Sequence, residues 1–142
     1  MSKSDADPRS RIQITDDAST IASKIKAAVT DSLGTVTYDP ETRPGVSNLL
    51  DLLAGLEGDG SAHPRDLVAR YDGKHSGALK ADLVEAATAT LGPIREAFLR
   101  LKADPGYLAS VEKNGRDQAR EIAATTMAEV RRAIGFDVQS FE

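Results

Sequence analysis

Apolar residues recur every three or four positions along most of this chain, and such spacing predicts α-helices that bury one face. The clearest stripe crosses Gly92-Pro93 without losing phase. We therefore expect one long helix that is kinked, and not broken, at the proline. The stripe consists of Leu79, Leu83, Ala87, Leu91, Ile94, Phe98 and Leu101.

A second stripe, over residues 119–134, predicts the last helix, and Gly135 is placed to end it. The turn at Asp104-Pro105-Gly106 separates the two stripes, and Asn114-Gly115 predicts an interruption or bend soon after that turn. Two long amphipathic helices joined by a tight turn are expected to pack antiparallel.

The first half of the chain predicts shorter elements. Asp16 or Asp17 is placed to cap a helix whose apolar positions continue to Leu33 and which Gly34 ends. The prolines that follow predict a loop over residues 35–45. Two short helices are then expected, over residues 48–56 and 64–71.

Composition supports an all-α fold. The chain has 142 residues, of which 40% are hydrophobic and only 4% aromatic, so a modest core of aliphatic residues and alanine is expected. We predict a helical bundle over residues 16–142, preceded by a loop and a short extended segment over residues 1–15. The absence of cysteine excludes disulfides and thiolate zinc sites. With no apolar run long enough to span a bilayer and no signal peptide, we expect no membrane partner and a cytoplasmic protein.

Few residues suggest chemistry. His63 and His75 lie in predicted loops at a spacing that does not indicate a metal pair, so no metal site is expected. No serine lies in a nucleophile elbow, and no glycine-rich loop follows a strand. What remains is Lys3 between Ser2 and Ser4, because a lysine flanked by hydroxyl groups on a loop suits the binding of a phosphate.

Three stretches together carry a family resemblance: Met1-Ser2-Lys3-Ser4, Tyr38-Asp39-Pro40-Glu41 and Arg43-Pro44-Gly45-Val46-Ser47-Asn48-Leu49-Leu50. They resemble tryptophan–tRNA ligases of the bacterial and mitochondrial type, which are class I aminoacyl-tRNA synthetases. The first stretch falls on the family's lysine-methionine-serine-lysine-serine loop. The chain is therefore expected to be the C-terminal portion of such an enzyme, beginning inside that loop.

The resemblance implies a function and a site. The family activates tryptophan with ATP and Mg²⁺ and charges the tryptophan tRNA, and its complete enzyme is a homodimer. Met1, Ser2, Lys3 and Ser4 would belong to the ATP-binding loop, with Lys3 as the catalytic residue that stabilises charge while pyrophosphate leaves. The family's nucleotide-binding half has no counterpart in this sequence, so the chain alone is expected to be inactive.

The resemblance also implies that the C-terminal helices contact the tRNA anticodon. The net charge of −4 does not by itself indicate a nucleic-acid binder, so contacts to RNA phosphates are expected from one face of these helices. The candidates are Arg95, Arg100, Lys113, Arg116 and Arg120. Solvated helix faces are the alternative interpretation of these side chains.

Two other functions stay open at this point. The chain is alternatively a free-standing tRNA-binding module that retains the anticodon-contacting helices, or one chain of a split synthetase that binds a separately encoded nucleotide-binding half. The mitochondrial matrix is the alternative to the cytoplasm as its location.

Overall fold

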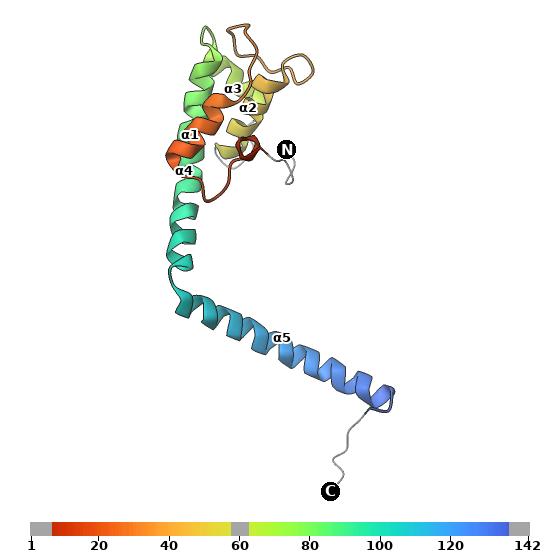
Figure 1. Cartoon of the computed structure of the whole chain (residues 1–142). Coiled ribbons are helices and arrows are strands. Elements are labelled where there is room, and N and C mark those ends of the chain that lie inside the picture. Colours follow the sequence, from red (N-terminus) through yellow and green to blue (C-terminus); the bar gives the residue numbers. More distant parts are fainter. Residues whose placement is uncertain (1–6, 58–62, 137–142) are drawn as a thin grey trace. The chain divides into compact units, whose positions relative to one another are not determined.

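The computed structural model describes residues 7–57 and 63–136, and these ranges contain helices and no strand (Figure 1). The prediction of an all-α fold is confirmed. The elements are η1 (Pro8–Ser10), α1 (Ala18–Ala27), α2 (Pro44–Leu56), α3 (Pro64–Val68), η2 (Ala69–Tyr71), α4 (Ser76–Lys102) and α5 (Pro105–Ala133), where η marks a 3₁₀ turn.

The chain forms two compact units, of which the first extends to Phe98 and the second begins at Leu99. The boundary that the sequence predicts between residues 15 and 16 stays a prediction. The first unit holds the buried core. α2 is its centre, since Val46, Leu50 and Leu53 have no exposed surface. Burying side chains of this size stabilises the fold by about 1.5–3 kcal/mol each.

The other helices of the first unit pack their apolar faces around α2. Ile21 and Ile25 come from α1, Leu67 from α3, and Leu79 and Leu83 from α4. Tyr71, in η2, is the largest fully buried side chain. Its hydroxyl donates a hydrogen bond of 2.8 Å to Asp82 Oδ2, so the polar end of this ring is satisfied inside the core.

The prediction that the first helix reaches Gly34 is wrong. α1 ends at Ala27, and Ala28 leaves the helical conformation with ψ 133°. Val29 and Leu33 continue the apolar spacing, but they are 86% and 67% exposed. Lys80 of α4 explains the early end, because its ammonium group donates to the carbonyl oxygens of Lys26 and Ala28 at 3.0 and 2.7 Å.

Most of the remaining elements match their predictions. α3 and η2 together cover residues 64–71, and α2 ends at Leu56 as expected, although it begins at Pro44. The segment before α1 contains an extended residue, Arg11, with φ −145° and ψ 146°.

The expected continuity at Pro93 is confirmed, because α4 runs through it. The expected interruption at Asn114-Gly115 is wrong, since α5 is continuous there. One helical glycine costs about 1 kcal/mol relative to alanine, which a helix of 29 residues tolerates.

α5 belongs to the second unit. Asp104 caps it by accepting a hydrogen bond of 2.9 Å from the Tyr107 amide, and Pro105 occupies its first turn. No residue of this helix is buried, and its apolar side chains, among them Val111 and Ile122, are 50% and 73% exposed. The antiparallel packing expected for the last two helices stays a prediction.

Candidate functional site

The predicted ATP-binding residues Met1, Ser2, Lys3 and Ser4 lie outside the described residues. The first described element after them is the 3₁₀ turn η1. Asp7 caps this turn by accepting hydrogen bonds from the Arg9 amide at 2.9 Å and from the Arg9 guanidinium at 3.0 Å. These bonds lower the pKa of the Asp7 carboxyl. Ser10 Oγ donates to the Asp7 carbonyl oxygen at 2.8 Å, which closes the turn.

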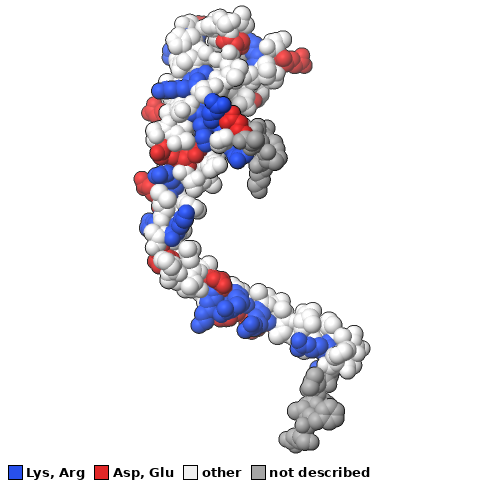
Figure 2. Space-filling view, viewed as in Figure 1, with Lys and Arg blue, Asp and Glu red and all other residues white. Residues whose placement is uncertain are grey.

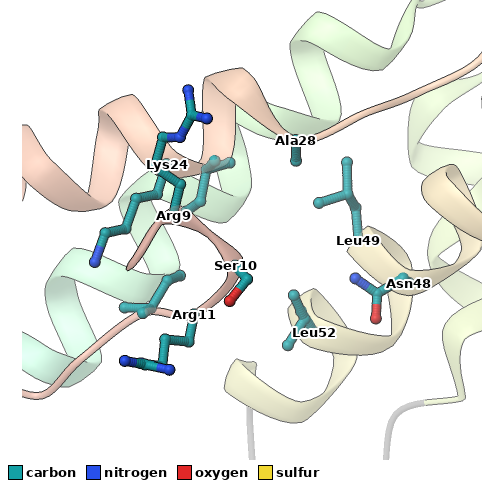
Figure 3. Close-up of a pocket in the computed structure, with 10 residues that line it drawn as sticks. Arg9, Ser10, Arg11, Lys24, Ala28, Asn48, Leu49 and Leu52 are labelled. Atoms are coloured by element: carbon teal, nitrogen blue, oxygen red, sulfur yellow. The ribbon is translucent and has the colours of Figure 1, made fainter. Parts of the chain in front are cut away.

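A hollow of about 100 Å³ lies between η1, the end of α1 and the middle of α2, and we call it the η1 hollow. Figure 3 shows Ser10 on one side of it, Asn48, Leu49 and Leu52 of α2 on the other, and Ala28 at its end. Five apolar side chains line it, together with one hydroxyl, one amide and three basic side chains; the apolar ones are Ile12, Ile25, Ala28, Leu49 and Leu52.

Basic side chains stand at the rim of the η1 hollow, but they do not make it an anion site. In Figure 3 the charged ends of Arg9, Arg11 and Lys24 point away from the α2 side chains. Arg9 forms an ion pair with Asp7, and Lys24 forms one with Asp16. In the part of the chain that the structure describes, no group of three or more acidic, histidine or cysteine side chains is arranged to hold a metal ion.

The stretch that begins at Arg43 has a structural role that the sequence did not predict. Arg43 is only 7% exposed, and its guanidinium forms two hydrogen bonds to Asp31, at 2.8 and 2.7 Å. It also donates to the Thr35 carbonyl oxygen at 2.7 Å and to the Thr37 hydroxyl. We call this set of contacts the arginine clasp. Hydrogen bonds from Arg43 lower the pKa of Asp31 to about 2.

The residues that follow the clasp fix the same connection. A Cβ on Gly45 would lie 2.4 Å from the Val29 carbonyl oxygen, so only glycine allows this approach of α2 to the segment after α1. Ser47 Oγ accepts a hydrogen bond of 2.9 Å from the Asp39 amide. Tyr38 donates from its hydroxyl to Asp51 Oδ1 at 3.0 Å. The stretch therefore holds the loop between α1 and α2 in place.

The histidines have local roles. His63 accepts a hydrogen bond of 3.1 Å from the Arg65 amide at the start of α3, and His75 accepts one of 3.0 Å from the Gly77 amide at the start of α4. Both are exposed, as expected for loop residues.

The candidate RNA-binding residues occupy different elements. Arg95 of α4 is tied to the segment before α1, because its Nε donates to the Thr15 carbonyl oxygen at 3.2 Å. Arg100 lies in the last turn of α4. Lys113, Arg116 and Arg120 of α5 are exposed and spaced by three and four residues, so they share one helix face. Figure 2 shows Lys and Arg side chains gathered over the first half of this helix.

Two residues with structural roles, Arg43 and Lys80, were not among the residues that the sequence singled out. A signal for Arg43 was present, because a single arginine before Pro-Gly in a loop followed by an apolar helix is placed to hold the loop. Lys80 carried no signal, since its partners lie 52 and 54 residues away. Among the described residues, no helix has the length and apolar character required to cross a membrane.

Comparisons with known proteins find similarity to aminoacyl-tRNA synthetases. The family model for class I tRNA synthetases (W and Y) matches residues 1–92. The chain is 42% identical over 135 residues to tryptophan–tRNA ligase 1 of Streptomyces coelicolor, and this alignment covers 95% of this chain and 39% of that protein. It is 40% identical over 136 residues to the tryptophan–tRNA ligase of Rickettsia conorii, and this alignment covers 96% of this chain and 40% of that protein.

Solved structures agree with the sequence comparison. The chain matches the crystal structure of tryptophanyl-tRNA synthetase from Mycoplasma pneumoniae with a TM-score of 0.68 and 27% identity. That match covers 100% of this chain and 42% of the other. The chain thus spans about two fifths of the length of the curated relatives it matches.

Proposed function

The chain belongs to the class I tRNA synthetases for tryptophan and tyrosine, and from this premise we propose that it is the C-terminal part of a tryptophan–tRNA ligase. Its relatives at 42% and 40% identity are tryptophan–tRNA ligases. The observation that carries the proposal is the extent of this similarity, which includes 95% of the chain. In the complete enzyme this part would serve the activation of tryptophan with ATP and the charging of the tryptophan tRNA.

Lys3 is the residue to which we assign catalysis, with Met1, Ser2 and Ser4 beside it in the ATP-binding loop. When bound, ATP would supply the adenylyl group for the tryptophan carboxylate, with pyrophosphate as the leaving group, and Mg²⁺ would neutralise charge on the phosphates. The contribution of Lys3 is a positive charge held near the departing pyrophosphate, a purely electrostatic role. The capped turn η1 begins four residues after Ser4, so an ordered turn would follow the proposed loop closely.

We propose that the helices after the loop contact the tRNA. Lys113, Arg116 and Arg120 form the strongest candidate surface, since they are exposed on one face of α5. Arg95 is the weakest candidate of the set, because its guanidinium already holds the Thr15 carbonyl oxygen. We further propose that the complete enzyme is a homodimer in the cytoplasm, with the mitochondrial matrix as the alternative location.

A fusion tests the proposal. The part of the Streptomyces coelicolor enzyme that this chain does not match is joined in front of Met1, and pyrophosphate exchange and tRNA charging are measured. We expect both activities. Lys3→Ala should slow exchange by about 10²-fold with little change in the KM for tryptophan, whereas Lys26→Ala on α1 should change neither. A folded fusion with no activity would contradict the proposal.

The exposed basic face of α5 also supports a second candidate, a free-standing tRNA-binding module. A gel-shift assay of the 142-residue chain with tryptophan tRNA over a salt series distinguishes the two. Specific binding by the chain alone that weakens steeply with salt favours the module. Activity that appears only when a separate nucleotide-binding half is added favours a split synthetase.

A further inference from the structure

We propose that the η1 hollow is the seat for one apolar side chain of the nucleotide-binding portion that the longer relatives possess. The inference rests on the proposed function, because it assumes that such a portion works together with this chain. It adds the place where the two bind, between η1, the end of α1 and the middle of α2, and the kind of group that fits there.

The size of the hollow points to a side chain. Pockets for cofactors and drug-sized ligands usually enclose about 300–1,000 Å³. The η1 hollow has about 100 Å³. A dry cavity of about 150 Å³ holds one benzene ring, so this hollow accommodates a group of the size of a valine or leucine side chain. An aliphatic side chain seated in a pocket is one kind of anchor that protein interfaces use.

The chemistry of the wall selects an apolar group over an anion. Ile12, Ile25, Leu49 and Leu52 contribute apolar surface. The ammonium group of Lys24 is paired with Asp16, and both side chains are only 11% exposed. A phosphate or carboxylate in the hollow would have to compete with an existing ion pair, whereas an apolar side chain would not.

The apolar surface continues beyond the hollow. A neighbouring depression shares Arg9, Ser10, Lys24 and Ala28 with it, and Ala27 and Val29 add apolar surface there beside the carboxylate of Asp7. Val29 is 86% exposed, the highest value among the exposed large apolar side chains of the described residues. An interface that fills the hollow would cover Val29 as well, which explains why an apolar residue stands there.

The relatives indicate the occupant. This chain spans only 39% of the Streptomyces coelicolor enzyme, although 95% of the chain is matched. About three fifths of that enzyme therefore has no counterpart here, and in the family resemblance this portion is joined to the signature loop of residues 1–4. The hollow begins at Arg9, five residues after Ser4, so under the proposed function the portion that precedes the loop in the relatives would be tethered close to it.

Cysteine protection tests the inference, because the chain contains no cysteine of its own. Asn48→Cys places a thiol at the hollow, Ser10→Cys places one on the opposite wall, and Ala81→Cys on the exposed side of α4 is the matched control. Each variant is made in the 142-residue chain and in the fusion described above. Modification by iodoacetamide is followed on the peptide that carries the new cysteine, by mass spectrometry.

We expect modification at positions 48 and 10 to be at least about tenfold slower in the fusion than in the chain alone, and modification at position 81 to differ less than about twofold. Equal rates at positions 48 and 10 in an active fusion would overturn the inference and leave the proposed function intact. Protection in an inactive fusion would support the inference and contradict the proposed function. Equal rates in an inactive fusion would refute both.

Discussion

Replacing Gly45 by alanine tests how closely α2 approaches the segment after α1. The added Cβ would lie 2.4 Å from the Val29 carbonyl oxygen and 3.3 Å from its carbonyl carbon. Real Cβ contacts essentially never fall below 3.0 Å, so these backbones must separate by at least 0.6 Å, the difference between 3.0 and 2.4. Because the atoms that clash belong to the backbone, no side-chain rotation relieves the contact.

Two effects of opposite sign decide the result. In a helix with free space around the glycine, alanine stabilises the protein by about 0.5–1 kcal/mol. Overfilling a packed site destabilises it by about 1–3 kcal/mol. For Gly45→Ala the second effect is larger, and we expect the free energy of unfolding to fall by about 1–2 kcal/mol. Gly55, in the same helix, has no atom within 4 Å of an added Cβ. Gly55→Ala should therefore raise the free energy of unfolding by about 0.5–1 kcal/mol.

The pair is measured by urea unfolding, followed by far-ultraviolet circular dichroism, on the parent chain and both variants. The expected pattern is a lower urea midpoint for Gly45→Ala and a higher one for Gly55→Ala. A midpoint for Gly45→Ala equal to or above that of the parent would refute the close approach. The Gly55→Ala variant is the control, because it shows the effect of the helix propensity of alanine without a steric clash.

Three further predictions follow from the contacts described above. The folded pKa of Asp31 is about 2, below its ordinary value of 3.8, so the stability that its carboxylate contributes is present above pH 3.8 and is lost as the pH falls from about 4 to about 2. Asp31→Asn should therefore make the decline in urea midpoint over this pH range smaller. An unchanged decline would contradict the role of the clasp. Lys80→Met removes the two hydrogen bonds from Lys80 to the end of α1 and should lower the free energy of unfolding by about 1 kcal/mol. Amide hydrogen exchange in the last turn of α1 should become faster. Exchange at the rate of the parent chain would argue against Lys80 as the group that caps α1. Replacing Lys113, Arg116 and Arg120 of α5 by alanine in the fusion should reduce the slope of log K for tRNA against log salt by about 2–3, and a slope equal to that of the parent fusion would remove them from the interface.

The parts of the fold that the sequence predicted are those decided by local signals. Proline at the first helical position predicted α3, and the phase of the apolar stripe across Pro93 predicted that α4 continues. Both signals act within a few residues of the element itself, so no knowledge of the tertiary structure was needed.

The two wrong predictions have different causes: a contact with a residue distant in the sequence, and too much weight given to the helix preference of a single residue. Val29 and Leu33 fit the spacing of the first helix, but Lys80 holds the carbonyl groups at Lys26 and Ala28, and the helix ends there. Gly115 suggested an interruption, yet the rest of α5 outweighs the preference of one glycine.

The candidate site was predictable only in part. Lys3 and its neighbours came from a family resemblance and lie outside the described residues. The η1 hollow joins residues of η1, α1 and α2 that are up to 43 positions apart, from Arg9 to Leu52, and no sequence spacing shows that they line one hollow. Such a site becomes visible only when the helices are packed.

The arginine clasp also bears on the order in which the chain assembles. It joins residues 12 positions apart, whereas Lys80 reaches back 54 positions to Lys26. The entropy lost on closing a loop grows with the logarithm of its length, so closing the longer loop costs about 1.3 kcal/mol more than closing the shorter one. The clasp can therefore form as soon as Arg43 has left the ribosome, before α4 is synthesised, and α1 and α2 then present a ready surface on which the later helix folds.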